Sequence, residues 1–275
     1  MSASEVSATA DCIYERAGEL FVPTKWAGGP WSPDTQHGAP PAGLFARMAE
    51  LAERESGLQL ARLTIDLCKP VPRVPLRLAT RWVRRGRKLG LVEGMLLRGD
   101  EEIARASALL LVPRAELAGS SSEPALTPLP PERAQAIEFM PSAFARDVPP
   151  GFHFSIEARI GRDELGLAAW ITTPLTLVAG EITSPQVRFG MLSDLTFAIG
   201  GHLFLRHAGQ TPRDTGTRFI NADITIYRER APEGEWLGYR PALISNQAGV
   251  GIAEVVQFDR AGRIGRSIQA LVAMT

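Results

Sequence analysis

The chain has 275 residues, of which 45% are hydrophobic and 22% are charged, a composition typical of a globular protein with a substantial core. Its 30 basic and 30 acidic residues give a formal charge of zero, which argues against nucleic acid or an anionic membrane as the main partner. No apolar stretch reaches the roughly 18 residues that a membrane span requires.

The amino-terminal residues carry no recognisable targeting signal. Residues 1–11 are small and acidic and lack the basic start and apolar run of a signal peptide. The two cysteines, Cys12 and Cys68, have no metal-ligand spacing and are too few for a disulfide scaffold. We therefore expect a cytoplasmic protein without a metal site.

The first predicted helix covers residues 40–53 and begins with two prolines, which the first turn of a helix tolerates. Leu44, Met48 and Leu51 fall on one apolar stripe of this helix. Strands are predicted over residues 63–67, 76–82 and 89–97, and from the turn at 98–100 to residue 112. Short turns between successive strands favour an antiparallel sheet.

The middle of the chain, residues 113–150, is rich in proline, serine and glutamate. Proline removes backbone donors and interrupts regular structure, so this segment is predicted to be a linker across the surface. The predicted organisation is an N-terminal repeat over 1–112, the linker over 113–150 and a C-terminal repeat over 151–275.

The flanking parts resemble each other. Residues 63–112 align without a gap with residues 224–273, and although only eight of the fifty pairs are identical, strands and turns follow in the same order. A hairpin turn is predicted at 259–262. Ser193 or Asp194 is predicted to cap a helix running through residues 195–199.

Two such repeats predict an α+β fold of the double hotdog type. In each repeat an antiparallel sheet would wrap around a central apolar helix. The two sheets would meet edge to edge and form one continuous sheet.

Seven motifs resemble the family of acyl-CoA thioesterase II, in the thioesterase superfamily. They are FVPT at 21–24, GPW at 29–31, QHGAPPA at 36–42, NADITI at 221–226, GEW at 234–236, GVGIAE at 249–254 and GRIGRSIQ at 262–269. The resemblance implies a thioester hydrolase of lipid metabolism that acts on a fatty-acyl or related acyl-CoA. It also implies a homodimer or higher homo-oligomer, and no cofactor, because coenzyme A is part of the substrate.

The resemblance also implies three catalytic positions. Asp194 matches the family's aspartate at the start of the second helix, and Gln269 matches its glutamine on the last strand. The third position falls on Asn221, where characterised members have threonine. In the repeat alignment Gln269 lies opposite Ala108 of the first repeat. The first repeat therefore lacks this glutamine, which indicates one working site per chain.

Thioester hydrolysis requires a water directed at the carbonyl carbon and donors for the oxyanion. Asp194 is suited to act as general base, with its charge stabilised by the helix dipole. The amides of Asn221 and Gln269 can hold the water, and backbone N–H groups near the helix start can bind the oxyanion.

Two other functions remain open. His37 and Gly38 precede the first helix and are predicted to bind substrate at the entrance, but His37 paired with Asp194 would suit a hotdog enoyl-thioester hydratase or dehydratase. A non-catalytic acyl-thioester binding protein is the other alternative. The basic run at 81–88 is either a solvated turn or a contact for the phosphates of coenzyme A.

Overall fold

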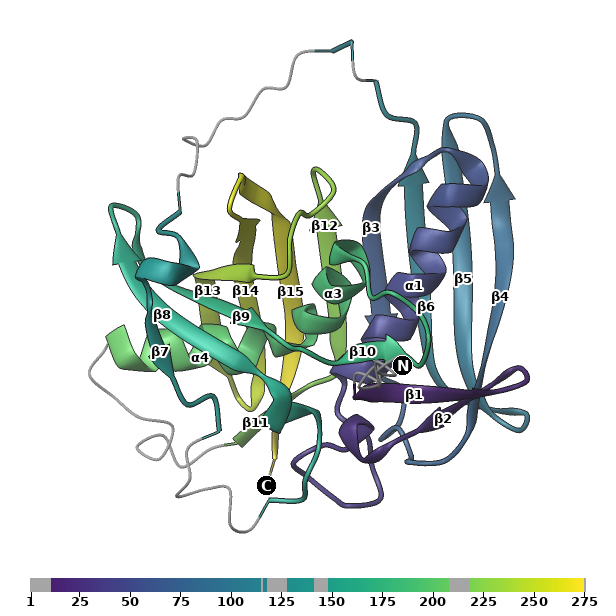
Figure 1. Ribbon diagram of the computed structural model, residues 1–275, viewed down its shortest axis with the longest axis horizontal. Coiled ribbons are helices and arrows are strands. Elements are labelled where there is room, and N and C mark those ends of the chain that lie inside the picture. The colour runs from purple at the N-terminus through teal and green to yellow at the C-terminus, as the bar shows by residue number, and fades with distance from the viewer. Residues whose placement is uncertain (1–10, 115, 118–127, 141–147, 208–217, 275) are drawn as a thin grey trace, which may run out of the picture.

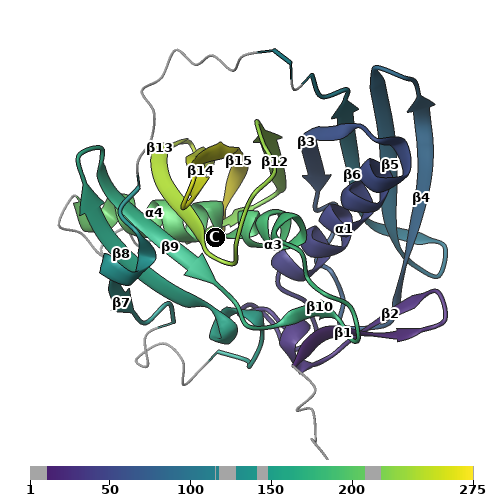
Figure 2. The ribbon, with the colours of Figure 1, turned by 45° about the horizontal axis from the view of Figure 1, so that its top comes forward.

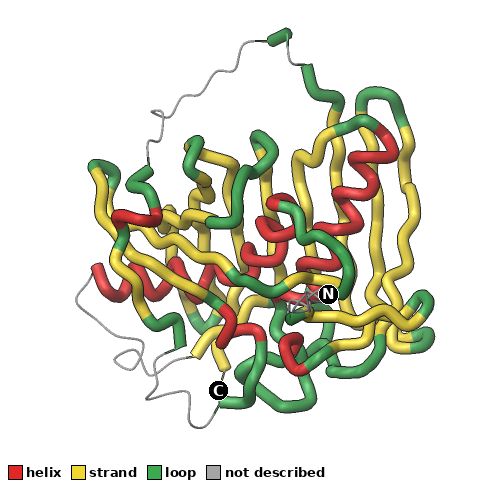
Figure 3. Tube along the Cα trace, viewed as in Figure 1, coloured by secondary structure: helices red, strands yellow, loops and turns green. Residues whose placement is uncertain are grey.

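The computed structural model describes residues 11–114, 116–117, 128–140, 148–207 and 218–274, with the backbone alone for 202–207 and 218. Its strands form one 15-stranded sheet that curls around the helices (Figure 1). Figure 3 shows the helices lying against the curled strands when the trace is coloured by secondary structure. Among the described residues, no helix is both long and apolar enough to cross a bilayer.

The first half confirms the predicted helix and strands. Its elements are β1 (Cys12–Ala17), β2 (Leu20–Pro23), η1 (Lys25–Ala27), α1 (Ala39–Ser56), β3 (Gln59–Asp66), β4 (Leu76–Arg85), β5 (Leu89–Arg98) and β6 (Glu101–Leu111). Helix α1 buries Leu44 and Met48 as expected. Leu51 was expected on the same face but is 45% exposed, because Phe45 and a row of alanines fill the helix–sheet contact instead.

The second half repeats this arrangement. Its elements are η3 (Phe152–Ser155), β8 (Glu157–Asp163), β9 (Gly166–Thr172), β10 (Thr176–Val178), α3 (Pro185–Leu192), η4 (Ser193–Leu195), α4 (Thr196–His207), β11 (Arg218–Asn221), β12 (Asp223–Arg228), β13 (Leu237–Gln247), β14 (Val250–Asp259) and β15 (Gly262–Met274). The predicted hairpin turn is confirmed, since Asp259 and Gly262 close the β14–β15 pair.

The two sheets join through an antiparallel pairing of β3 with β12, in which Thr64 lies opposite Thr225. These two threonines are also equivalent in the repeat alignment, so a pseudo-twofold axis passes between them. Outward from this junction the strand order is β6, β5, β4, β2 on one side and β15, β14, β13, β9 on the other. The predicted double hotdog with one continuous sheet is therefore confirmed.

Some segments cross between the halves or extend the sheet. Within the predicted linker, η2 (Pro131–Arg133) precedes β7 (Gln135–Ile137), which pairs with β8 at the end of the sheet. Strand β10 pairs in parallel with β1 of the first half. The exact boundaries 1–112, 113–150 and 151–275 stay a prediction.

The predicted helix through residues 195–199 is confirmed by η4 and α4, but helix α3, which precedes it, was not predicted from the sequence. Ser184 caps α3 by accepting a hydrogen bond from the Val187 N–H, and Pro185 follows at the first helical position. Ser193 and Asp194 instead lie in the 3-10 turn η4 between α3 and α4. Figure 2 shows α3 beside α1, so this break faces the start of α1.

Candidate active site

A cavity of ≈ 150 Å³ lies where the loop before α1, the η3 segment, the η4–α4 junction and the end of β11 meet. Its lining residues among those the structure describes are Pro30, Trp31, His37, Gly38, Phe139, Met140, His153, Asp194, Leu195, Phe197, Ala198, Phe219, Ile220 and Asn221. Both halves of the chain therefore contribute to it, and it includes four of the five predicted site residues.

The Asp194 carboxylate is the centre of the polar wall, with a side chain only 3% exposed. Its Oδ1 accepts a hydrogen bond of 2.9 Å from Asn221 Nδ2. Its Oδ2 lies 2.9 Å from His37 Nδ1. The same Nδ1 accepts a hydrogen bond of 3.1 Å from the Ala39 N–H, so this nitrogen lies between a backbone donor and the carboxylate. Nε2 of His37 is then the ring nitrogen left for water or substrate.

The absence of a side chain at Gly38 leaves room for the Asp194 carboxylate. This glycine is the N-cap residue of α1 and has no side chain to cap the helix. A Cβ built on Gly38 would overlap the Asp194 carboxylate. The carboxylate thus occupies the positive end of α1, whose dipole stabilises its charge. The sequence predicts stabilisation by the second-half helix, and the structure adds the N-terminus of α1 on the other side of the carboxylate.

Gln269 lies close to Asp194 but contacts its backbone and not its carboxylate. The side chain is fully buried, and Nε2 donates to the Asp194 carbonyl oxygen at 2.9 Å. Oε1 accepts from the Phe197 N–H at 2.9 Å. Gln269 is not among the described residues that line the cavity, so its contacts favour holding the helix break over binding water.

His153 is a cavity residue that no sequence pattern singled out. It is 1% exposed, and neither ring nitrogen has a hydrogen-bond partner of good geometry among the described residues. Its ring stacks near that of His37, with centroids 6.3 Å apart. Desolvation, and secondarily the neighbouring His37, lower the pKa of His153 to about 4. The imidazole is therefore neutral near pH 7.

A close backbone contact between the halves brings the two histidines together. The Phe152 N–H donates to the Gly28 carbonyl oxygen at 2.9 Å. A Cβ on Gly151 would overlap Gly28, so the approach requires glycine. Because the partners are more than a hundred residues apart, only a prediction of this tertiary contact could have found His153.

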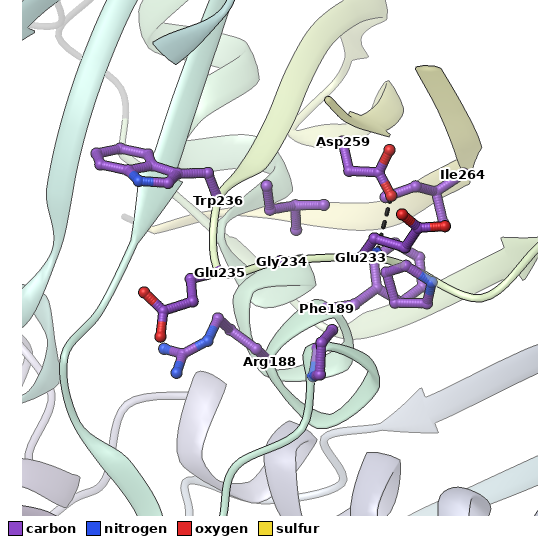
Figure 4. A pocket seen from close by; sticks show the side chains of 11 residues that line it. Arg188, Phe189, Glu233, Gly234, Glu235, Trp236, Asp259 and Ile264 are labelled. Atoms are coloured by element: carbon purple, nitrogen blue, oxygen red, sulfur yellow. Dashed lines mark hydrogen bonds between the residues drawn. The ribbon is translucent and has the colours of Figure 1, made fainter. Parts of the chain in front are cut away.

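Other regions fit catalysis less well. A pocket of ≈ 10 Å³ near the start of α3 has room for about one water, and Figure 4 shows the Glu235 carboxylate facing Arg188 there. In the basic run, Arg85 pairs with Glu55 near the end of α1, about 27 Å of helix from the cavity. Among the described residues, no three His, Cys, Asp or Glu side chains form a metal-binding group.

Solved structures of similar fold include hydrolases and a dehydratase. A protein described as a thioesterase from Novosphingobium aromaticivorans aligns with a TM-score of 0.68 at 14% identity, covering 96% of this chain and 99% of its own. An acyl-CoA thioesterase II from Mycobacterium marinum aligns with a TM-score of 0.60 at 16% identity, covering 87% and 90%. A dehydratase domain of a trans AT polyketide synthase aligns with a TM-score of 0.51 at 11% identity, covering 83% and 87%.

At such identities these likenesses show the fold alone. No curated protein sequence matches the chain. Two family models do match, the acyl-CoA thioesterase N-terminal domain over residues 27–111 and the acyl-CoA thioesterase C-terminal domain over residues 118–273. Because these models together span most of the sequence, the chain belongs to the acyl-CoA thioesterase family.

Proposed function

We propose that this protein hydrolyses an acyl-CoA thioester to a carboxylic acid and free coenzyme A at the cavity around Asp194. The observation that carries the proposal is the buried carboxylate with Asn221 on one oxygen and His37 on the other. This arrangement orients a base, a donor and a helix N-terminus toward the same space.

In the proposed reaction, His37 and Asp194 act together as the base. In the working tautomer Nδ1 carries its proton toward Asp194 in place of accepting from the Ala39 N–H, so Nε2 of His37 can accept a proton from the attacking water. The hydroxide forms a bond to the thioester carbon. When the carbon–sulfur bond breaks, the proton on Nε2 passes to the departing thiolate. Asp194 remains ionised and stabilises the imidazolium between these steps.

The oxyanion would be bound by donors of the same cavity wall that are not used by Asp194. Nδ2 of Asn221 has two hydrogens, of which one goes to Asp194. The second can donate to the carbonyl oxygen, while the N-terminal end of α1 adds a favourable dipole. Gln269 has a supporting role, since it fixes the backbone that carries Asp194.

A thiol-release assay tests the proposal. We expect Asp194→Asn to lower kcat/KM about 10³-fold or more, because the amide cannot hold the Nδ1 proton or stabilise the imidazolium. We expect His37→Ala to lower it about 10²-fold to 10³-fold through loss of the proton acceptor. Asp100→Asn, in the exposed β5–β6 turn, is the matched control and should keep full activity. Full activity of either site variant would refute the assignment.

Gly38→Ala tests the geometry without removing any functional group. The added methyl would displace the Asp194 carboxylate, and we expect about a 10²-fold loss of activity. Gly18→Ala, in an exposed turn with φ of 62°, should lose stability without a comparable loss of activity.

The contact between His37 and Asp194 also favours a second candidate, an enoyl-thioester hydratase or dehydratase. In that reaction the same pair would move protons between water and the carbons next to the thioester. Incubation with a 2-enoyl-CoA separates the two: hydrolysis releases the thiol, whereas hydration removes the enoyl absorbance and leaves the thioester intact.

A further inference from the structure

The cavity has a second wall that the proposed chemistry does not use. The described residues of its lining include side chains that offer no charge. They are Trp31, Phe139, Met140, Leu195, Phe197, Phe219 and Ile220. An apolar wall in the same cavity as the polar groups is suited to hold the part of the substrate that carries no charge, which is the acyl group.

Aromatic rings dominate this wall. Phe197 on α4 and Phe219 on β11 meet edge to face, with centroids 6.0 Å apart and an interplanar angle of 73°. Trp31, in the loop before α1, is 56% exposed although it lines the cavity. Aromatic rings prefer offset or edge-to-face contacts with further rings, and a methionine such as Met140 packs well against a ring. Such a wall favours a flat ring over a flexible chain.

The size of the cavity also favours a compact acyl group. At ≈ 150 Å³ it is smaller than the roughly 300–1,000 Å³ of pockets that hold drug-sized ligands. A cavity of about 150 Å³ lined by apolar side chains holds one benzene ring. The reacting carbonyl must share the same space, so a long alkyl chain would have to extend outside it.

We propose that the acyl group of the substrate is compact and aromatic, a single ring of the benzoyl or phenylacetyl type. This inference rests on the proposed function for the reaction, but its argument comes from the apolar wall. The ring packs against Phe197 and Phe219, and its thioester carbonyl faces His37, Asp194 and Asn221. A straight chain gains contact only up to about six carbons.

The test is a panel of benzoyl-, phenylacetyl-, butyryl-, hexanoyl- and decanoyl-CoA. We expect kcat/KM to rise about tenfold from butyryl to hexanoyl, as two methylenes become buried, and not to rise further at decanoyl. The aromatic thioesters should exceed decanoyl-CoA at least tenfold and hexanoyl-CoA severalfold. Decanoyl-CoA equal to or better than the aromatic thioesters would overturn the compact cavity, and hexanoyl-CoA equal to or better than them would overturn the aromatic preference.

Cavity variants localise the preference. Ala198 is exposed on α4 and lines the cavity, so Ala198→Leu should lower kcat/KM for benzoyl-CoA about tenfold and leave acetyl-CoA nearly unchanged. Ala242→Leu, exposed on β13 and outside the cavity lining, is the matched control and should change neither. Equal losses for both substrates in Ala198→Leu would place the acyl group elsewhere.

Binding separates this inference from the proposed function. If no thioester releases thiol, the proposed hydrolysis is wrong, and calorimetric binding to the Asp194→Asn protein then decides the acyl preference. Tighter binding of benzoyl-CoA than of decanoyl-CoA supports the aromatic site, and the reverse order overturns it.

Discussion

The two halves bury different side chains at equivalent positions of the same sheet. On the last strand of each repeat, the second half has Gln269 where the first has Ala108, and both are fully buried. On the preceding strand, the second half has Gln257 where the first has Leu96, and again both are fully buried. The inner face is thus apolar in one half and partly polar in the other.

The helices above these faces differ accordingly. Helix α1 runs unbroken for 18 residues, so its interior needs no outside partners for backbone groups left open by a break. The second helix breaks at η4, and its backbone groups there need other partners. Gln269 supplies them, while Gln257 donates to the Ser193 hydroxyl at 2.8 Å and Thr196 donates to Ser267 at 2.8 Å.

This difference between the two halves explains why we expect one site per chain. The break presents Asp194 to the cavity, and only a polar inner face can stabilise it. The first half contributes the intact N-terminus of α1, with Gly38 and His37, to the same site. One repeat supplies a broken helix and the other an unbroken one, and the site needs both.

The largest effect on stability is expected at Arg228, where the aligned residue in the first half is Leu67. Arg228 is buried and pairs with Glu53 of α1 while donating from Nε to the Leu60 carbonyl oxygen at 3.1 Å. We expect Arg228→Leu to lower the free energy of unfolding by about 3 kcal/mol, because the partly buried Glu53 loses its cation and the Leu60 carbonyl oxygen loses its donor.

Chemical denaturation checks this expectation. The double variant with Glu53→Leu should recover most of the loss, because no unpaired charge remains. Arg98→Leu removes an exposed pair with Glu101 and should change stability little. A double variant as unstable as Arg228→Leu would mean that the loss does not come from the unpaired carboxylate.

A loss of stability no larger than that at Arg228 is expected from making the second sheet resemble the first. Gln269→Leu leaves the Asp194 carbonyl and the Phe197 N–H without partners and should cost about 3 kcal/mol of unfolding free energy. Gln257→Leu reproduces the residue of the first half and should cost about 1 kcal/mol, since its Oε1 has no hydrogen-bond partner of good geometry in the described part of the chain. Denaturant midpoints compare the two, and equal losses would contradict the proposed role of Gln269 in holding the break.

An effect smaller than that of Gln269→Leu is expected from the dependence of stability on pH at His153. Its pKa is about 4 in the folded protein against an ordinary value of 6.5, so the unfolded chain binds more protons between these values. Stability from this residue is complete above pH 6.5 and is lost as the pH falls toward 4, by about 2 kcal/mol between pH 7 and pH 5.

Urea unfolding of the wild type and of His153→Phe across this pH range measures the contribution of His153 to the free energy of unfolding. The variant should lose about 2 kcal/mol less than the wild type on going from pH 7 to pH 5. Parallel losses in both proteins would show that His37, Asp194 or other groups carry the acid sensitivity.

The sequence alone determined the repeat, most of the strands and the first helix. These features depend on local alternation, turns and spacing, which the chain carries at each position. The constant offset between residues 63–112 and 224–273 makes Thr64 equivalent to Thr225, and the structure shows that these two residues meet at the junction. The start of α3 also has a local sequence signal, Ser184 followed by Pro185. Only the next helix was predicted from the sequence, with Ser193 or Asp194 as its cap.

The assembly of the site depends on tertiary contacts that the sequence does not reveal locally. His37 and Asp194 are far apart in sequence and meet because α1 and the η4 break face each other across the two halves. The space beside Gly38, the Gly28–Gly151 contact and the burial of His153 likewise depend on how the repeats dock. Local patterns report the conformation of a segment, whereas a shared site depends on which segments come into contact when both halves fold.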